Sequence, residues 1–291
     1  MCDRDHFDTI IGFDCDGFYR FPSIPYIVSI KGVLADEAKQ EKGWIRWMLK
    51  LQARWEAQNV QQADLVIATS QYSKKVIVEN YRVDPNKIFI LPELIDVQSW
   101  EELLTISNRG QAPISATVLS VCRMYPRKNL GLLLQAWVQV REKDRNAQLR
   151  IVGTGQEYKR WRKLAEKLRL QDSVLFLGDR SHEELAEEYK NCDIFCLPSR
   201  QEGFGIVFLE AMVAGKPIVA ACAAAVPEVV REGKEGFLVS PDDPAQLASA
   251  LLELIQSPEL RSRMGQSARL YVKKYDAIEV AKQFVGIKVI P

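Results

Sequence analysis

Two glutamates eight positions apart frame the segment whose residue types are best suited to chemistry. Glu202 lies in a glycine-flanked loop, Gly203–Gly205, and Glu210 lies in a helix expected to begin near Ile206. The apolar run Ile194–Leu197 indicates a buried strand just before this loop. Glycines let bare amides approach a ligand, so one carboxylate can reach a sugar and the other the hydroxyls of a ribose. Taken alone, two glutamates at this spacing are usually surface residues.

Three cations follow another predicted strand. Arg123, Arg127 and Lys128 come after Ala116–Val121 and before a helix that begins near Asn129. Backbone N–H groups and the dipole at a helix start favour an anion, so a diphosphate fits this position. Read by themselves, the three side chains would be solvated loop charges.

A glycine pair, Gly153 and Gly155, ends the next strand and precedes a further helix. Two glycines at such a place allow the backbone to come close to a ligand, or they make a tight turn. The pattern alone favours the turn.

Short apolar runs alternating with helical patterns place these motifs at strand ends. The C-terminal strands are expected at Ala116–Val121, Gln148–Val152, Val174–Leu177, Ile194–Leu197, Pro217–Ala221 and Gly236–Val239. The clearest helices between them are Asn129–Glu142, Gln156–Leu168 and Ser181–Asn191. Near-continuous apolar strands separated by helices predict a parallel, doubly wound sheet that binds ligands at the carboxyl ends of its strands.

The N-terminal part repeats this alternation in shorter form. Its strands are expected at Thr9–Phe13, Tyr26–Ile30, Leu65–Thr69 and Ile88–Leu91, with one long helix from about Asp36 to Ala63. The fold class is therefore α/β with two Rossmann-like doubly wound domains. We expect a shortened N-terminal domain over residues 1–108, a second domain over 109–275, and a tail or helix over 276–291 that packs back on the first. A polar segment, 107–113, is the expected hinge.

Composition excludes several classes of protein. The 291 residues carry 39 Lys plus Arg and 38 Asp plus Glu, so there is no positive field to hold a nucleic acid. No apolar stretch reaches about 18 residues, and Met1–Asp16 lacks the pattern of a signal peptide, so we expect a cytoplasmic protein. The six cysteines form no CxxC pair and are expected to be reduced thiols. The terminal cluster Cys2, Asp3, Asp5 and His6 is too poor in firm ligands to predict a metal.

With these motifs in place, the chain resembles the retaining GT-B glycosyltransferases commonly called family 4. The resemblance is carried by VCRMYPRKNL, IVGTGQE, CDIFCLPSRQEGFGIVFLEAMVAGKPIVA, VPEVV and EGFLVSPDD. It implies metal-independent transfer from a nucleoside diphosphate sugar with retained configuration, and no cofactor besides that donor. By the match, Arg123 and Lys128 hold the diphosphate, Glu202 lies near the reacting centre, and Glu210 binds ribose. The implied donor-binding set is completed by Gly153, Gly203, Phe204, Gly205 and Ile206.

Four features depart from the family pattern. The N-terminal domain is shorter, and it lacks the usual first glycine-rich loop. Lys31 stands where a catalytic histidine is usual, so we assign the catalytic role there to Lys31. Glu93 replaces a frequent asparagine, and Ala223–Ala225 replaces glycines before Pro227.

Two other functions remain alternatives. A transferase-like subunit of impaired activity would bind a nucleotide or a partner without turnover. A strand followed by Asp14, Cys15, Asp16 and Gly17 resembles the nucleophile motif of haloacid-dehalogenase-like phosphatases, although no convincing lysine motif accompanies it.

A second surface is predicted in residues 39–58. Lys42, Arg46, Lys50 and Arg54 recur every four residues beside a stripe of Trp44, Trp47, Met48, Leu51 and Trp55. Adjacent basic and aromatic stripes suit peripheral contact with the inner face of an anionic membrane, and the acceptor would then be a lipid. The alternative, which the pattern favours, is a helix whose aromatic stripe packs into the core.

Overall fold

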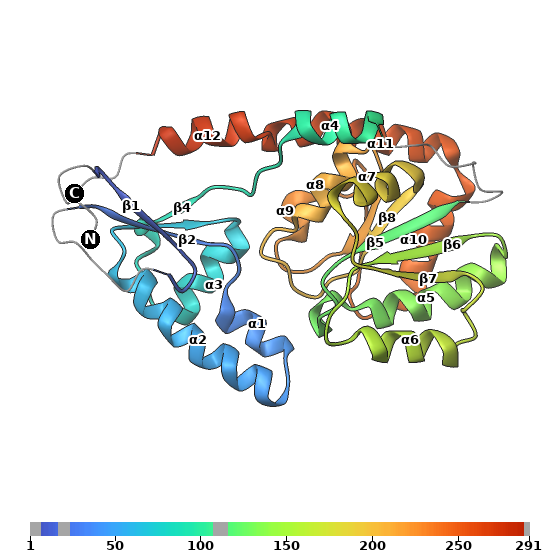
Figure 1. Ribbon diagram of the computed structural model, residues 1–291, viewed down its shortest axis with the longest axis horizontal. Coiled ribbons are helices and arrows are strands. Elements are labelled where there is room, and N and C mark those ends of the chain that lie inside the picture. Colours follow the sequence, from blue (N-terminus) through green and yellow to red (C-terminus); the bar gives the residue numbers. More distant parts are fainter. Residues whose placement is uncertain (1–6, 17–23, 107–115, 288–291) are drawn as a thin grey trace. The chain divides into compact units, whose positions relative to one another are not determined.

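The computed structural model describes residues 7–16, 24–106 and 116–287, which divide into two compact units (Figure 1). Unit 1 comprises residues 1–93 and 278–291, and unit 2 comprises residues 94–277. Each unit has its own parallel sheet and its own hydrophobic core. The expected α/β class with two Rossmann-like halves is confirmed. The expected hinge at 107–113 lies outside the described residues.

Unit 1 is built on a sheet with the strand order β1-β2-β3-β4. Its strands are β1 (Ile10–Phe13), β2 (Tyr26–Ile30), β3 (Leu65–Ala68) and β4 (Ile88–Ile90). Its helices before β4 are α1 (Leu34–Gln40), α2 (Gly43–Gln62), α3 (Gln71–Tyr81) and the short η2 (Pro85–Lys87). The inner strand β2 is buried along its whole length, whereas the edge strand β1 is half exposed although its residues are apolar.

The single long helix expected from Asp36 to Ala63 is wrong, because the chain forms two helices there. Glu41 and Lys42 adopt an extended backbone between α1 and α2, and Gly43 has a positive φ of 57°. Residues with a side chain rarely adopt that φ, whereas glycine adopts it freely. The break is therefore set by one glycine within an otherwise continuous helical pattern.

Two polar side chains on the buried side of α2 bind backbone groups of neighbouring segments. The Asn59 amide donates to the carbonyl of Asp14, at 2.7 Å, and also to that of Asp16. The Glu56 carboxyl group accepts from the Leu34 amide at 3.0 Å, at the start of α1, and from the Tyr81 hydroxyl. Glu56 is fully buried, and burial raises its pKa to about 7. A buried carboxyl group of α2 thus caps α1, which has no local side-chain cap.

Unit 2 contains a six-stranded sheet. Its strands are β5 (Thr117–Val121), β6 (Gln148–Val152), β7 (Val174–Gly178), β8 (Ile194–Leu197), β9 (Ile218–Ala221) and β10 (Gly236–Val239). Its helices are α4 (Val97–Ile106), η3 (Pro126–Lys128), α5 (Leu130–Lys143), α6 (Tyr158–Lys167), α7 (His182–Asn191), α8 (Ile206–Val213), α9 (Val226–Val229), α10 (Pro244–Gln256), α11 (Pro258–Val272) and η4 (Lys273–Tyr275). The helix α12 (Ala277–Val285) begins at its boundary. The observed strands differ from the expected bounds by at most one residue at either end.

The order of strands in unit 2 reverses at its centre. The sheet runs β10-β9-β8-β5-β6-β7, so the chain proceeds from β5 to one edge and then returns to pair β8 with the other side of β5. Helices α7 and α8 lie on one face of the sheet, and α5 and α6 lie on the other (Figure 1). In open α/β sheets, ligands bind outside the carboxyl ends of the strands at such a reversal. The point between β5 and β8 is thus the expected site.

The two units divide after Glu93, earlier than the boundary at residue 108 expected from sequence. The reason is that α4 packs against α7 and α8, with Trp100 buried beside Tyr189. Near this boundary the amide of Ile95 donates to the carbonyl of Tyr275 at 3.0 Å, and the amide of Ala277 donates to that of Ile95 at 3.0 Å. The segments that enter and leave unit 2 are therefore joined side by side.

Candidate functional site

Loops from the carboxyl ends of four strands in unit 2 are bound to one another. The amide of Arg200, after β8, donates to the carbonyl of Arg127, after β5, at 2.8 Å. The amide of Ala225, after β9, donates to the carbonyl of Glu202 at 3.3 Å. The guanidinium of Arg200 pairs with Asp242, after β10, at 2.5 Å. The loops that carry the predicted site residues thus form one connected rim.

A buried ion pair lies where β5 and β8 meet. Lys128 Nζ is 2.6 Å from Glu202 Oε1, and both side chains are almost excluded from solvent. Arg127 Nη1 lies 3.7 Å from the other carboxylate oxygen of Glu202. Sequence reasoning gave Lys128 and Glu202 separate roles, whereas the structure brings them into direct contact across the reversal point.

The carboxylate of Glu202 is kept ionised by its neighbours. Burial alone raises the pKa of such a group, but the charges of Lys128 and Arg127 outweigh it and hold the pKa below its ordinary value. Removing water from the pair also strengthens its electrostatic interaction. The site therefore presents a fixed negative charge next to a fixed positive one.

Arg127 is a residue that the predicted site set omitted. Its guanidinium approaches Glu202 and the carbonyl of Gln201, while its backbone anchors Arg200. The signal was present in the run of three cations, but spacing alone did not distinguish Arg127 from Arg123. Arg123 is exposed, and among the described residues its side chain has no ion-pair partner. Its role in binding a diphosphate stays a prediction.

The Gly153–Gly155 loop is explained by close packing of backbone on backbone. Gly153 has a φ of 111°, and a Cβ there would lie 2.1 Å from the carbonyl oxygen of Cys122. The Met124 amide donates to the carbonyl of Thr154 at 2.8 Å, which binds this loop to the one after β5. This packing does not test whether Gly153 also contacts a nucleotide-sugar donor, so that contact stays a prediction.

The glycine-flanked loop turns the chain into α8. Gly205 has a φ of 99°, and a Cβ there would lie 2.6 Å from the ring of Phe208. No side chain among the described residues caps α8, whose first residue, Ile206, is exposed. Phe204 is buried. The backbone amides from Phe204 to Ile206, rather than their side chains, are therefore the groups suited to a ligand.

Glu210 lies one turn further along α8. Burial raises the pKa of its carboxyl group, and the hydroxyl of Tyr189 donates to Oε2 at 2.7 Å. Tyr189 is fully buried and is also packed against Phe195 of β8. Glu210 is thus held by a residue of α7 through Oε2. Among the described residues, no side chain hydrogen-bonds to its other carboxylate oxygen, Oε1. Its contact with a ribose stays a prediction.

Lys31 belongs to unit 1, where it follows β2. Its ammonium lies 3.1 Å from Glu93 Oε2, and its amide donates to Asp14 Oδ1 at 2.8 Å. The two departures from the family pattern, Lys31 and Glu93, therefore contact each other. Asp14 is the residue that the phosphatase alternative takes as its nucleophile. Here its carboxylate accepts a hydrogen bond from the backbone amide of Lys31, after β2. The catalytic role of Lys31 stays a prediction.

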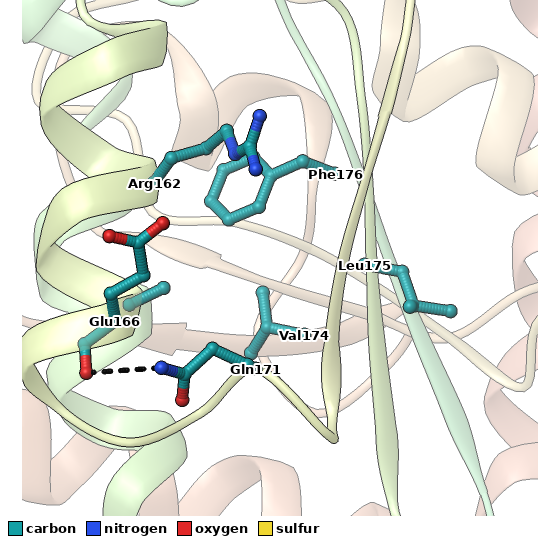
Figure 2. Close-up of a pocket in the computed structure, with 7 residues that line it drawn as sticks. Arg162, Glu166, Gln171, Val174, Leu175 and Phe176 are labelled. Atoms are coloured by element: carbon teal, nitrogen blue, oxygen red, sulfur yellow. Dashed lines mark hydrogen bonds between the residues drawn. The ribbon is translucent and has the colours of Figure 1, made fainter.

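Several cavities of unit 2 lie apart from these residues. One, of about 230 Å³, is formed by α6 and the edge strand β7 and is lined by Arg162, Glu166 and Phe176 (Figure 2). Another, of about 510 Å³, is lined in part by Lys216 and Arg269. Those two cations donate to carbonyls at the ends of α7 and α8, so they neutralise helix C-termini rather than await an anion.

Among the residues that the structure describes, no group of three His, Cys, Asp or Glu side chains is placed to hold a metal ion. The cluster of Cys2, Asp3, Asp5 and His6 lies outside the described residues. None of the described helices combines the length and apolar character needed to cross a bilayer.

The core-packing interpretation of the Trp-rich helix is wrong. Trp44, Trp47 and Trp55 on α2 are 70%, 55% and 43% exposed, and Trp44 stacks on Trp47 with ring centroids 4.7 Å apart. The buried side of α2 consists instead of Ala53, Glu56, Asn59 and Val60. The predicted basic stripe, Lys42, Arg46, Lys50 and Arg54, is exposed as well. Both stripes therefore face solvent.

Two parallel-sheet units with ligand loops at a strand-order reversal define a GT-B type α/β fold, and solved structures share it. Anabaena Alr3699/HepE in complex with UDP-glucose superposes with a TM-score of 0.77, at 23% identity over 90% of this chain and 71% of that one. WaaG, a glycosyltransferase involved in lipopolysaccharide biosynthesis, has a TM-score of 0.75, at 22% identity over 96% of this chain and 77% of that one.

The family is shown by sequence. The profile of glycosyl transferases group 1 matches residues 108–271, and that of glycosyltransferase family 4 matches residues 6–99. The chain belongs to the glycosyl transferases group 1. It is 32% identical to a D-inositol 3-phosphate glycosyltransferase of Corynebacterium efficiens, over 80% of this chain and 58% of that protein. A protein of the same name from Stackebrandtia nassauensis is 30% identical over 79% and 55%. The chain thus spans a little over half the length of these relatives.

Proposed function

We propose that the chain is a retaining, metal-independent glycosyltransferase that moves a sugar from a nucleoside diphosphate sugar to an acceptor. The observation that carries the proposal is the buried, ionised Glu202 paired with Lys128 at the reversal point between β5 and β8. Family membership supports the class of reaction, and the complex of HepE with UDP-glucose makes UDP the first nucleotide to test.

The arrangement of charges suits the transition state of sugar transfer. As the bond to the diphosphate breaks, positive charge develops on the sugar and negative charge on the leaving group. The fixed carboxylate of Glu202 stabilises the first, while Lys128 and the amides before α8 stabilise the second. Lys128 has three N–H donors, so it can bind Glu202 and a phosphate oxygen together. The charges are in place before the donor arrives, which lowers the cost of reorganisation.

Replacing the two glutamates separately tests these roles. Glu202→Gln should lower kcat by about a hundredfold or more with little change in nucleotide affinity, because the carboxylate acts mainly in the transition state. Glu210→Gln should mainly raise the donor KM, because a ribose contact acts on ground and transition states alike. Slow hydrolysis of UDP-glucose, followed by mass spectrometry, supplies the rates without an acceptor. Full kcat in a folded Glu202→Gln protein refutes the catalytic assignment.

The alternative of an impaired, nucleotide-binding subunit makes a different prediction. It binds one of UDP, GDP, ADP or CDP, which raises the melting temperature by mass action, but it neither hydrolyses nor transfers the sugar. Binding without turnover for every donor and acceptor tested would favour this alternative.

We further propose that α2 attaches the protein to an anionic membrane surface. Exposed tryptophans beside a row of cations are the combination that inserts at a lipid interface, and a soluble surface gains nothing from exposing them. The acceptor remains open among a glycan, a lipid and a small molecule, and attachment of this kind favours a lipid.

Co-sedimentation with vesicles of phosphatidylcholine and phosphatidylserine tests the attachment. The protein should bind at low salt, and the triple change of Arg46, Lys50 and Arg54 to Glu should release it. A matched control changes Lys159, Lys163 and Lys167, exposed cations of α6 whose tryptophan is buried, to Glu. Equal release by both triple variants would show only a general charge effect, and absence of binding by the wild type would exclude the attachment.

A further inference from the structure

Tyr275 lies at the point where the chain enters and leaves unit 2. The chain enters the unit after Glu93 and leaves it after Ala277. The amide of Ile95 donates to the carbonyl of Tyr275, and the amide of Ala277 donates to the carbonyl of Ile95, each at 3.0 Å. We call this pairing of Ile95 with residues 275–277 the bridge. Because both connections between the units pass through the bridge, a change there acts on both at once.

The side chain of Tyr275 reaches from the bridge to the glycine-flanked loop. Its ring meets that of Phe204 edge to face, with centroids 5.4 Å apart and an interplanar angle of 84°. The two residues are 4% and 5% exposed, so the contact is buried. The Tyr275 hydroxyl also donates to the carbonyl of Glu228 in α9 at 3.4 Å. In a close-packed interior, Phe204 cannot change position without displacing Tyr275.

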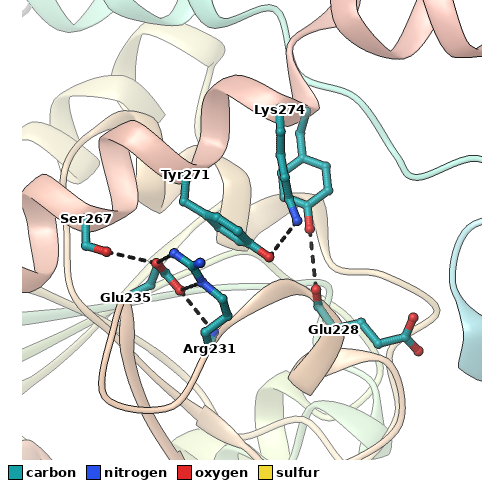
Figure 3. A network of polar contacts seen from close by, with 7 residues as sticks. Glu228, Arg231, Glu235, Ser267, Tyr271 and Lys274 are labelled. Carbon is teal, nitrogen blue, oxygen red and sulfur yellow. Dashed lines mark hydrogen bonds and ion pairs between the residues drawn. The ribbon is translucent and has the colours of Figure 1, made fainter.

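A network of charged and aromatic side chains fixes Tyr275 in turn. The ring of Tyr271 has Arg231 Cζ at 3.8 Å and Lys274 Nζ at 3.9 Å from its centroid (Figure 3). Arg231 is held by Glu235, whose side chain is fully buried. Tyr271 meets Tyr275 edge to face at 5.8 Å. Such cation–π and edge-to-face contacts make η4 a stiff support for the Tyr275 ring.

We propose that Tyr275 is a positioning residue that couples the loop Gly203–Gly205 to the bridge. The inference rests on the proposed function, since it takes a nucleoside diphosphate as the ligand of that loop. A ligand that fixes the loop fixes Phe204, and Phe204 then restrains Tyr275 and reduces opening of the bridge. By reciprocity, a closed bridge favours binding of the ligand. The amides of Ile95 and Ala277 report on this opening, because their hydrogen bonds form the bridge.

Hydrogen exchange of the full chain with and without saturating UDP tests the coupling. In the wild type, UDP should slow exchange of the Ile95 and Ala277 amides by about fivefold or more. Tyr275→Leu should keep the protection that UDP gives to the loop but lose it at the bridge. Tyr275→Phe retains the ring contact and should behave as the wild type does, which a role that depends on the hydroxyl would not predict.

Tyr158→Leu is the matched control, because it removes a ring of unit 2 that meets Phe176 edge to face and, among the described residues, makes no ring contact with Phe204 or Tyr275. It should keep the protection at the bridge, and loss in this variant too would overturn the assignment to Tyr275. The assignment is also overturned if UDP still protects the bridge in Tyr275→Leu. It is overturned as well if UDP protects the loop of the wild type but not its bridge. If Tyr275→Leu does not fold, Phe204→Leu tests the contact from its other side by the same readout. Absence of any protection of the wild type by UDP, GDP, ADP and CDP refutes the proposed function, and the coupling with it.

Discussion

Replacing Glu56 by Gln should remove a loss of stability that the wild type suffers as the pH rises. The carboxyl group is fully buried and has a pKa of about 7, because burial disfavours its charged form. In the unfolded chain the same group has a pKa of about 4.3. Between these two values the native state holds a proton that the unfolded state releases, so the free energy of unfolding falls with rising pH.

The size of the effect follows from this difference. At about 1.4 kcal/mol per pKa unit, the wild type loses about 2 to 3 kcal/mol between about pH 5 and pH 8.5, with no further loss above that window. The charged form is further opposed by Asp14 and Glu37, which face Glu56 from the β1 loop and from α1. Gln keeps a neutral acceptor for the amide of Leu34 and for the hydroxyl of Tyr81, so it should show no such loss.

Equilibrium urea unfolding at the two pH values measures the effect. Glu253→Gln, at an exposed position of α10, is the matched control for removal of one carboxylate and should follow the wild type. Parallel loss of stability in the wild type and in Glu56→Gln would show that the Glu56 carboxyl does not titrate in this range.

Five further substitutions test other parts of the structure. Lys128→Ala should lower the free energy of unfolding by about 3 to 5 kcal/mol, because it leaves a buried carboxylate unpaired, whereas Arg123→Ala should change it by less than about 0.5 kcal/mol. Both should weaken nucleotide binding about tenfold in calorimetry, and unchanged affinity in both would remove them from the diphosphate site. Lys31→Ala should lower kcat for transfer about tenfold or more while nucleotide affinity stays within about twofold. Glu93→Ala should lower kcat by a smaller factor. Equal kcat in Lys31→Ala excludes its catalytic role. Gly153→Ala should destabilise the protein by about 1 to 3 kcal/mol in thermal unfolding, since a Cβ there meets a backbone carbonyl, and an unchanged melting temperature would contradict that packing.

The sheets could be predicted from sequence because their inner strands are continuous apolar runs. β8 and β9 contain only apolar residues and are buried along their whole length, and β5 is equally buried although it includes Thr117 and Ser120. The break before α2 could not be predicted, because helical periodicity continues through Gly43 and only its positive φ interrupts the helix.

The sequence predicted which residue types form the candidate site, but it did not predict which of their side chains contact each other. Lys128 and Glu202 are 74 positions apart, and their contact depends on β8 pairing with β5, which no local pattern specifies. The exposed tryptophans of α2 were misassigned for a similar reason. A helical pattern shows that two sides of a helix differ, but which side is covered depends on the sheet beneath, and here Ala53 and Val60 face it.

The bridge between Ile95 and Asp276 makes unit 2 a natural module for exchange. A segment that begins and ends at one place can be replaced by its counterpart from a relative with both joins kept in register. Chimeras of group 1 transferases cut at these two positions would combine unit 2 of one protein with unit 1 of another. The same adjacency permits a circular permutant of unit 2, because a short linker suffices to join its natural ends.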